Sequence, residues 1–277
     1  MGETESEIDT MLELHEWNTS FQWEDREGPF RRVTDDQAAQ FDRDGYIVIE
    51  DLIDAETLAA ATAEIDRFEA KVDAFLKTQP DERMMIAESG ALTVTLHIAA
   101  HNDVVRTLVS SPALVDVCAD LIGPDVNLYW DQAVYKKPEK PRRVPWHQDN
   151  GYTYIEPQQY LTIWLALTDA TLDNGCPHVA PGLHKHGTLA HYYVEPLGFE
   201  CFEDPPREAT APVKAGGAVV FSSLMPHLTG PNLTDEVRKA YIVQYAPAGA
   251  YTRTADGDVP CDDPRRQFAV LRDGEYV

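Results

Sequence analysis

The chain has 277 residues, of which 43% are hydrophobic, a composition typical of a globular protein that builds a core. Its 47 acidic and 23 basic residues give a net charge of -24, which repels phosphate backbones and anionic lipid surfaces, so neither nucleic acid nor a membrane is expected as a partner. No uncharged apolar run is long enough to span a bilayer, and the acidic start does not resemble a signal peptide, so a cytoplasmic location is expected.

The first part of the chain has mainly helical patterns. Residues 1–32 are charged and show no sustained period, so we interpret them as an arm. Thr34 and Gln37 have the spacing of a capping box, and Gly45 can end the short helix that they begin. A β-branched strand is predicted over 46–53, a long amphipathic helix over 54–77 and further helix over 102–123. Residues 33–123 are therefore predicted to form a mainly helical support.

The pattern changes after residue 124 to short apolar runs separated by glycine, proline and asparagine. Strands are predicted within 126–137, 144–149, 160–170, 216–223 and 239–247. Such spacing favours an antiparallel sandwich or barrel, against which the earlier helices would pack on one outer face. With no repeat or low-complexity linker, we expect a single domain consisting of the arm, the helical support, a β core over 124–250 and a C-terminal extension over 251–277.

A candidate metal site begins with His147 and Asp149 in the predicted strand 144–149. Side chains two apart in a strand share a face, so this pair would present a nitrogen and an oxygen to one point. The alternative is two polar residues at a strand end, because a lone H-x-D pair is common by chance. His227, after the strand 216–223, would complete two histidines and one carboxylate, the facial set that leaves open positions on Fe(II). A structural zinc site would need a fourth ligand, usually cysteine, and no cysteine is adjacent.

Arg238 lies eleven residues beyond His227, at the start of a predicted strand. Alternation would place Arg238, Ala240, Ile242 and Gln244 on one face. A guanidinium inside a barrel needs a compensating anion, either a carboxylate-bearing cosubstrate or an acidic residue of the protein, and the sequence alone leaves both open.

Three segments, "WHQDNGY", "LTIWLALTDATLDNGCPHVAPGLHKHG" and "MPHLTGPN" followed by Arg238, resemble the phytanoyl-CoA dioxygenase family of Fe(II)/2-oxoglutarate-dependent oxygenases. The resemblance covers about residues 38–250. It implies a mainly β fold, a double-stranded β-helix of the jelly-roll, cupin-like type, buttressed by N-terminal helices. It also implies Fe(II) as cofactor, with 2-oxoglutarate and O2 as cosubstrates.

The resemblance assigns roles to seven positions. His147, Asp149 and His227 match the metal ligands, and Arg238 matches the residue that binds the far carboxylate of 2-oxoglutarate. Trp164, Thr229 and Gln132 match positions near the cosubstrate. The alternative for Trp164 is core packing, and for Thr229 and Gln132 an ordinary turn or strand position.

The segment 174–187 contains three further histidines, His178, His184 and His186, which we do not assign as ligands. Asn174-Gly175 and Pro181-Gly182 are turn signals, and the resemblance places this segment as a connection that shapes the pocket mouth. Leu183 stands where relatives commonly have serine, a departure that would alter loop hydrogen bonding and leave the metal site unchanged.

The implied reaction converts 2-oxoglutarate into succinate and CO2 and hydroxylates a C–H bond of a small-molecule substrate. Alternatives with the same cofactors are desaturation, epimerisation or ring closure. A cupin-like metal hydrolase or isomerase would not need Arg238, and a non-catalytic jelly-roll binding protein or 2-oxoglutarate sensor would perform no reaction. Because halogenating relatives replace the carboxylate ligand and this chain retains Asp149, no halogenation is expected.

The basic segment 135–143, in an otherwise acidic chain, could attract an anionic substrate or could be a solvated loop. No oligomeric state follows from the sequence.

Overall fold

The computed structural model describes residues 12–277. Its helices are α2 (Asp35–Asp44), α3 (Ala55–Leu76), α4 (Asp103–Val109), α5 (Pro112–Leu121) and α6 (Asp149–Tyr152), with 3-10 turns η1 (Pro80–Glu82), η2 (Ile98–Ala100) and η3 (Leu183–His186). Within these residues no helix is long and apolar enough to cross a bilayer.

The larger sheet has ten strands, paired antiparallel. Along its main path it contains β1 (Tyr46–Ile49), β13 (Ala218–Ser222), β8 (Leu161–Ala166), β15 (Arg238–Pro247), β5 (Val126–Lys136), β4 (Leu92–Leu96), β3 (Ala87–Glu88) and β2 (Arg83–Met84). Two strands of the C-terminal extension, β18 (Ala269–Arg272) and β19 (Glu275–Tyr276), join it through β5.

A second sheet of four strands carries two of the predicted metal ligands. Its order is β12 (Ala209–Thr210), β9 (Pro177–Val179), β14 (His227–Thr229) and β6 (Val144–His147). The remaining strands form a hairpin of β10 (Tyr192–Val194) and β11 (Gly198–Glu200), and a three-stranded sheet of β7 (Ile155–Glu156), β16 (Tyr251–Thr254) and β17 (Gly257–Pro260).

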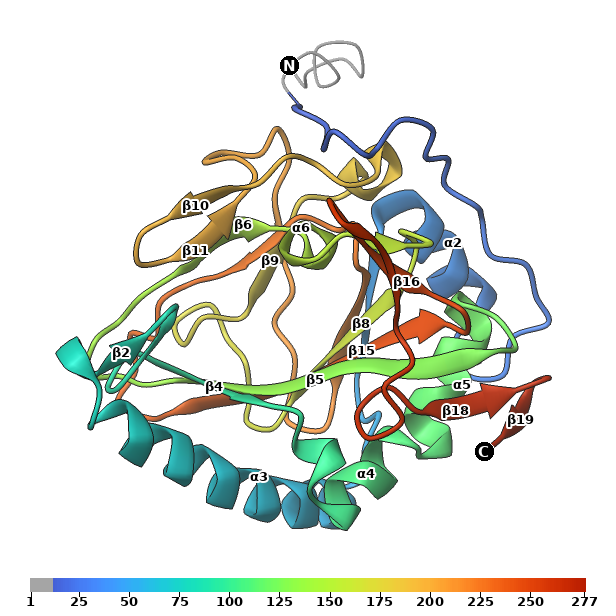
Figure 1. The fold of residues 1–277 in the computed structure, drawn as a ribbon. Coiled ribbons are helices and arrows are strands. Elements are labelled where there is room, and N and C mark those ends of the chain that lie inside the picture. The colour runs from blue at the N-terminus through green and yellow to red at the C-terminus, as the bar shows by residue number, and fades with distance from the viewer. Residues whose placement is uncertain (1–11) are drawn as a thin grey trace.

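The two main sheets face each other across an apolar interior, while the helices cover the outer face of the larger sheet (Figure 1). Trp164 and Ile242 of the larger sheet and Val179 of the smaller one belong to the cluster between the sheets. Ile65 of α3 and Tyr241 of β15 belong to the cluster under the helices. The predicted jelly roll, mainly β with N-terminal helices against one sheet, is confirmed.

Local signals explain the two N-terminal helices. The Thr34 hydroxyl accepts from the Gln37 backbone N–H and the Gln37 side chain accepts from that of Thr34, which completes the predicted capping box, and Gly45 ends α2 at φ 83°. Asp54 caps α3 by accepting from two backbone N–H groups of its first turn.

Strand β15 is the central element for the site. It pairs with β5 from Arg238 opposite Lys136 to Pro247 opposite Val126, with a bulge after Gln244, and with β8 on its other side. Arg238, Ile242 and Gln244 therefore share the face that points between the sheets, as the alternation predicts.

The structure differs from the predicted elements in several places, and the helix predicted over 102–123 is divided into α4 and α5. The first strand ends at Ile49, because the chain turns at Asp51 with φ 51°. Strand β6 ends at His147, and Asp149 begins α6, so the prediction that both lie in one strand is wrong. Part of the expected connection 174–187 is strand β9, which lies beside β14 in the smaller sheet.

The described part of the N-terminal arm packs on the body. Ala190 donates its backbone N–H to Glu13, and the Asn18 side-chain amide donates to the Thr188 carbonyl at 3.0 Å. Residues 1–11 of the predicted arm lie outside the described residues.

Candidate active site

The structure brings His147, Asp149 and His227 together. His147 ends β6, Asp149 follows at the start of α6, and His227 begins β14, directly opposite His147 in the register. One ligand atom from each lies within 4.8 Å of the others, and His227 Nε2 is 4.0 Å from Asp149 Oδ1. The change from strand to helical turn at residue 148, rather than strand alternation, brings Asp149 beside the two imidazoles.

Backbone carbonyls hold both imidazoles in one orientation. His147 Nδ1 lies 2.8 Å from the Pro145 carbonyl and His227 Nδ1 lies 3.0 Å from that of Met225. A nitrogen at that distance from a carbonyl carries a proton, so in the neutral ring Nε2 is the lone-pair donor. Burial, and then the neighbouring His227, holds the pKa of His147 well below its ordinary value, which keeps it in the neutral form that binds metals.

The turn between His147 and Asp149 is held by the buried side chain of Gln148. Its amide donates to the carbonyls of Gly187 and Leu224, at 2.9 and 2.7 Å, and accepts from the Leu189 N–H. The backbone N–H of Gln148 donates to Nε2 of His191 at 2.9 Å. The loop 187–191 thus fixes the backbone that carries two candidate ligands.

Arg238 is buried, with 1% of its surface exposed, and none of its three guanidinium nitrogens has a hydrogen-bond partner among the described residues. Its Cζ lies 5.0 Å from the ring centroid of Trp164. Burial lowers the pKa of Arg238 to about 9, so the side chain is still cationic at neutral pH. No carboxylate within residues 12–277 pairs with it, so the acidic-residue alternative does not hold there.

The other three predicted residues lie on the same inner surface. Trp164 is 3% exposed on β8, and Thr229 is 7% exposed on β14, two residues beyond His227. Gln132 lies on β5 opposite Ile242 and accepts a hydrogen bond from Trp130 Nε1 at 3.2 Å.

The three histidines of segment 174–187 do not join the metal group, which within the described residues contains only His147, Asp149 and His227. His178 pairs with Glu208, and His184 is buried against Trp23, with ring centroids 4.4 Å apart.

Sequence reasoning missed several supporting residues. Thr162 donates a hydrogen bond to Asp149 Oδ2 at 2.5 Å, His191 supports Gln148, and Lys136 is buried rather than part of a surface patch. The alternation of β5 could have indicated Lys136, because it is in phase with Gln132, whereas no local signal marks His191 or Thr162.

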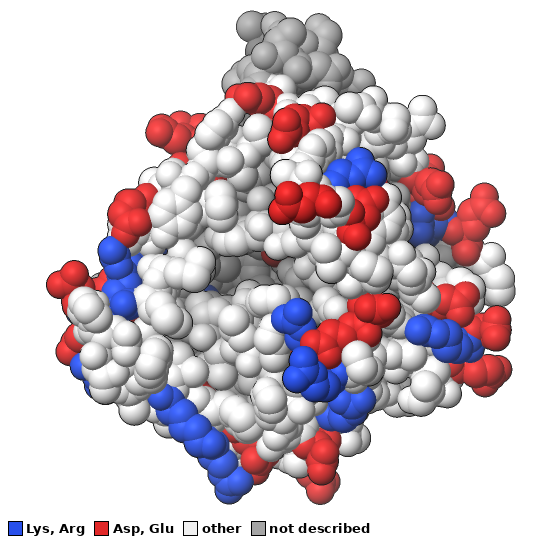
Figure 2. Space-filling model, viewed as in Figure 1, with Lys and Arg blue, Asp and Glu red and all other residues white. Residues whose placement is uncertain are grey.

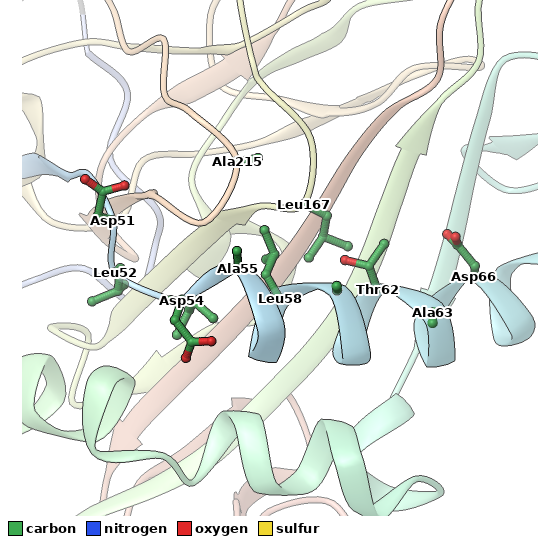
Figure 3. A pocket seen from close by; sticks show the side chains of 12 residues that line it. Asp51, Leu52, Asp54, Ala55, Leu58, Thr62, Ala63, Asp66, Leu167 and Ala215 are labelled. Carbon is green, nitrogen blue, oxygen red and sulfur yellow. The ribbon is translucent and has the colours of Figure 1, made fainter.

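The space between the sheets opens to solvent. Figure 2 shows the molecule hollowed near the middle of this face, with a mostly uncharged rim. A separate surface pocket of about 900 Å³ lies at the start of α3, where Leu58, Thr62 and Asp66 line it (Figure 3). None of the three candidate ligands lines that pocket.

The donor set fits a ferrous ion. Two imidazole nitrogens and one carboxylate oxygen could hold Fe(II) and would leave further coordination positions for small ligands. The guanidinium on the same inner surface, which has no hydrogen-bond partner within residues 12–277, fits a carboxylate-bearing cosubstrate. Fold and site together define the class of non-haem iron, 2-oxoglutarate-dependent oxygenases.

The chain belongs to the phytanoyl-CoA dioxygenase family, whose model, described as phytanoyl-CoA dioxygenase (PhyH), matches residues 41–240. It is 28% identical over 261 residues to an ectoine dioxygenase of Sphingopyxis alaskensis, covering 85% of this chain and 82% of that one. It is 29% identical over 259 residues to a methylphosphonate hydroxylase of Gimesia maris, covering 86% and 89% of the two chains.

Among solved structures, EvdO2 from Micromonospora carbonacea var. aurantiaca in complex with 2-oxoglutarate matches with a TM-score of 0.64 and 25% identity, covering 85% of this chain and 97% of that one. The carbocyclase SnoK from nogalamycin biosynthesis matches with a TM-score of 0.68 at 21% identity, covering 82% and 90%. Because SnoK is only 21% identical to this chain, its similarity shows the fold alone. The chain is a 2-oxoglutarate-dependent non-haem iron dioxygenase that acts on small molecules.

Proposed function

We propose that the protein hydroxylates an unactivated C–H bond of a small-molecule metabolite in the cytoplasm, with release of succinate and CO2. In this proposal His147, Asp149 and His227 hold Fe(II), and Arg238 binds the far carboxylate of 2-oxoglutarate. The observation that carries it is the buried guanidinium, without a hydrogen-bond partner within residues 12–277, on the inner surface that also bears three candidate metal ligands. Bound iron would supply the O2 chemistry.

The chain's own residues have three tasks in this reaction. The two imidazoles and the carboxylate offer one ligand atom each, and these atoms lie within 4.8 Å of one another. Trp164 covers one face of the Arg238 guanidinium, and with Thr229 and Gln132 it is proposed to shape the cosubstrate pocket. The two imidazoles are buried, which limits the access of water to this side of the candidate metal group.

Hydroxylation is favoured over desaturation, epimerisation or ring closure because two relatives that match most of the chain are named a hydroxylase and a dioxygenase of small molecules. The epimerase and carbocyclase among the solved structures share the fold at lower identity. Product mass spectrometry separates these outcomes, since hydroxylation adds one oxygen atom and desaturation removes two hydrogens.

The proposal includes an anionic substrate, but the basic segment 135–143 gives it little support. Each of its cations already has a partner. Lys140 and Arg142 pair with Glu88, Arg143 with Glu200 and Lys137 with Glu69, while Lys136 bonds to backbone carbonyls.

The deciding experiment is an anaerobic titration of the metal-free protein with Fe(II) and 2-oxoglutarate, followed by O2. We expect a metal-to-ligand charge-transfer band and then succinate formation that a substrate panel stimulates. A band without succinate would indicate a 2-oxoglutarate sensor. If no band forms, the cofactor assignment is wrong.

A further inference from the structure

A second buried cation lies directly beside Arg238. Lys136 is the last residue of β5 and is opposite Arg238, the first residue of β15. Each side chain is only 1% exposed. Because residues opposite each other in a sheet point to the same face, the Lys136 ammonium lies on the inner surface with the guanidinium.

Three backbone carbonyls bind the Lys136 ammonium. Nζ donates to the Thr229 carbonyl at 2.8 Å, to that of Arg142 at 3.0 Å and to that of Gly230. All three ammonium donors are used, and no carboxylate within residues 12–277 pairs with the lysine. Two of these carbonyls lie just after His227, in the segment that carries Thr229.

The same segment is confined on its other side. Gly175 has φ 85°, and a Cβ at this position would collide with the Gly230 carbonyl oxygen. The Asn232 side chain then donates to the Lys136 carbonyl at 3.0 Å. Thr229 and Gly230 are therefore held between the end of β5 and the Asn174-Gly175 turn.

The charge of this pair is unbalanced in the free protein. Burial first, and then Arg238 and Arg142, lowers the pKa of Lys136, whereas the three carbonyl acceptors around Nζ favour the charged ammonium. A buried ammonium beside a buried guanidinium, with no carboxylate pairing with either within residues 12–277, is costly, and an anion placed beside them would offset much of that cost. The proposed far carboxylate of 2-oxoglutarate at Arg238 is such an anion.

We propose that Lys136 is a positioning residue for the cosubstrate, which fixes the Thr229–Gly230 segment and adds a second positive charge to the Arg238 site. This inference depends on the proposed function, because it concerns the same cosubstrate. It predicts that Lys136 acts on 2-oxoglutarate affinity and leaves the metal group unaltered, since its ammonium bonds to none of the three candidate ligands.

The test compares Lys136→Met and Lys136→Gln with Lys137→Met. Glutamine keeps hydrogen-bond donors toward the carbonyls and removes the charge. It therefore tests the role of the charge even if the methionine variant does not fold. Lys137 is the matched control, because it is the next residue and pairs with Glu69 of α3 on the outer face at 2.6 Å.

The measurements are the dissociation constant of 2-oxoglutarate from the anaerobic charge-transfer band, the affinity for Fe(II), and the rise in melting temperature on adding 2-oxoglutarate. We expect Lys136→Met to raise that dissociation constant by about tenfold or more and the KM for 2-oxoglutarate similarly, while kcat at saturation stays within about twofold. The Fe(II) affinity of Lys136→Met should match that of the wild type. Lys137→Met should match the wild type in all of these measurements.

Wild-type 2-oxoglutarate affinity in both Lys136 variants would overturn the inference. An equal loss in Lys137→Met would also overturn it, because the effect would then follow from general destabilisation. Absence of the band in the wild-type protein is a different result, which contradicts the proposed function itself.

Discussion

The hydroxyl of Thr162 donates a hydrogen bond to Oδ2 of Asp149 at 2.5 Å, from a strand on the opposite sheet. Asp149 Oδ1 faces His227 Nε2 at 4.0 Å. One carboxylate oxygen is thus held by β8 while the other remains available to a metal. The bond therefore joins β8 of the larger sheet to the first residue of α6, which directly follows strand β6 of the smaller sheet.

Replacing Thr162 with valine should weaken Fe(II) binding by about tenfold, because hydrogen-bond partners of metal ligands typically contribute factors of this size. Valine keeps the volume and the β-branch, so the fold should persist. Fe(II) titration of the metal-free protein measures the effect. Thr93→Val is the matched control, since Thr93 is also buried in a strand and donates to Glu69 at 2.8 Å. Equal Fe(II) affinities in all three proteins would contradict a role for the Thr162 hydroxyl.

Gly45 should tolerate alanine poorly for two separable reasons. Its φ of 83° is unfavourable for any residue with a Cβ, and that Cβ would lie 2.5 Å from Nδ1 of the buried His184 ring. We expect Gly45→Ala to lower the free energy of unfolding by about 3 kcal/mol. Gly249 has φ 84° with no atom within 4 Å of an added Cβ, so Gly249→Ala should cost only about 1 kcal/mol. Denaturant unfolding of both variants checks the difference, and equal losses would show that crowding at His184 contributes nothing.

Stability should fall on acidification because of His184. Burial lowers its pKa to about 4, whereas the unfolded chain protonates near the ordinary value of about 6.5. As pH falls from about 6.5 to about 4, the unfolded state takes up a proton that the folded state does not, which lowers the free energy of unfolding by up to about 3 kcal/mol. His191, whose pKa burial also lowers to about 4, acts in the same direction.

Unfolding of the metal-free protein between pH 7 and pH 4 measures this slope. His184→Leu should flatten it in part, and His101→Leu, at an exposed position, should leave it unchanged. A His184→Leu protein with the full wild-type slope would assign the acid sensitivity to other groups.

Elements with strong local signals were predictable from the sequence. The capping box at Thr34, the apolar stripe of α3 and the β-branched runs of β13 and β15 each favour one structure, and the fold agrees with them. The change from strand to helix at Asp149 was not predictable, because residues 144–149 all continue a strand pattern. The turn depends on Gln148, whose side chain is fixed by contacts with the distant loop 187–191.

Lys136 shows the limit most clearly. Five cations within nine residues indicate a solvated surface, yet the pairing of β5 with β15 places Lys136 opposite Arg238, on the face that points between the sheets. Lys136 is buried because it lies opposite Arg238, about a hundred residues further along the chain, and because carbonyls of the Thr229–Gly230 segment accept hydrogen bonds from its ammonium. Alternation along β5 indicates which face Lys136 is on, whereas its burial depends on tertiary pairing that no local window contains.

The guanidinium of Arg238 has no hydrogen-bond partner within residues 12–277, so its removal is predicted to stabilise the metal-free protein. Replacing it with methionine should increase the free energy of unfolding of the metal-free protein by about 1 kcal/mol or more, because an isolated buried charge is removed and the aliphatic packing is kept. The same change should abolish the 2-oxoglutarate-dependent charge-transfer band while Fe(II) still binds. Denaturant unfolding and anaerobic spectroscopy measure the two effects on one preparation.

Arg142→Met is the control for the predicted increase in the free energy of unfolding. Arg142 is half-buried, but it is paired with Glu88 at 3.0 Å, so its removal takes away one of the two cations that pair with this carboxylate and should not stabilise the protein. If Arg238→Met instead lowers the free energy of unfolding, the guanidinium has a compensating partner in the free protein. The case for a bound carboxylate at this position would then lose its main support, whatever the outcome of the metal titration.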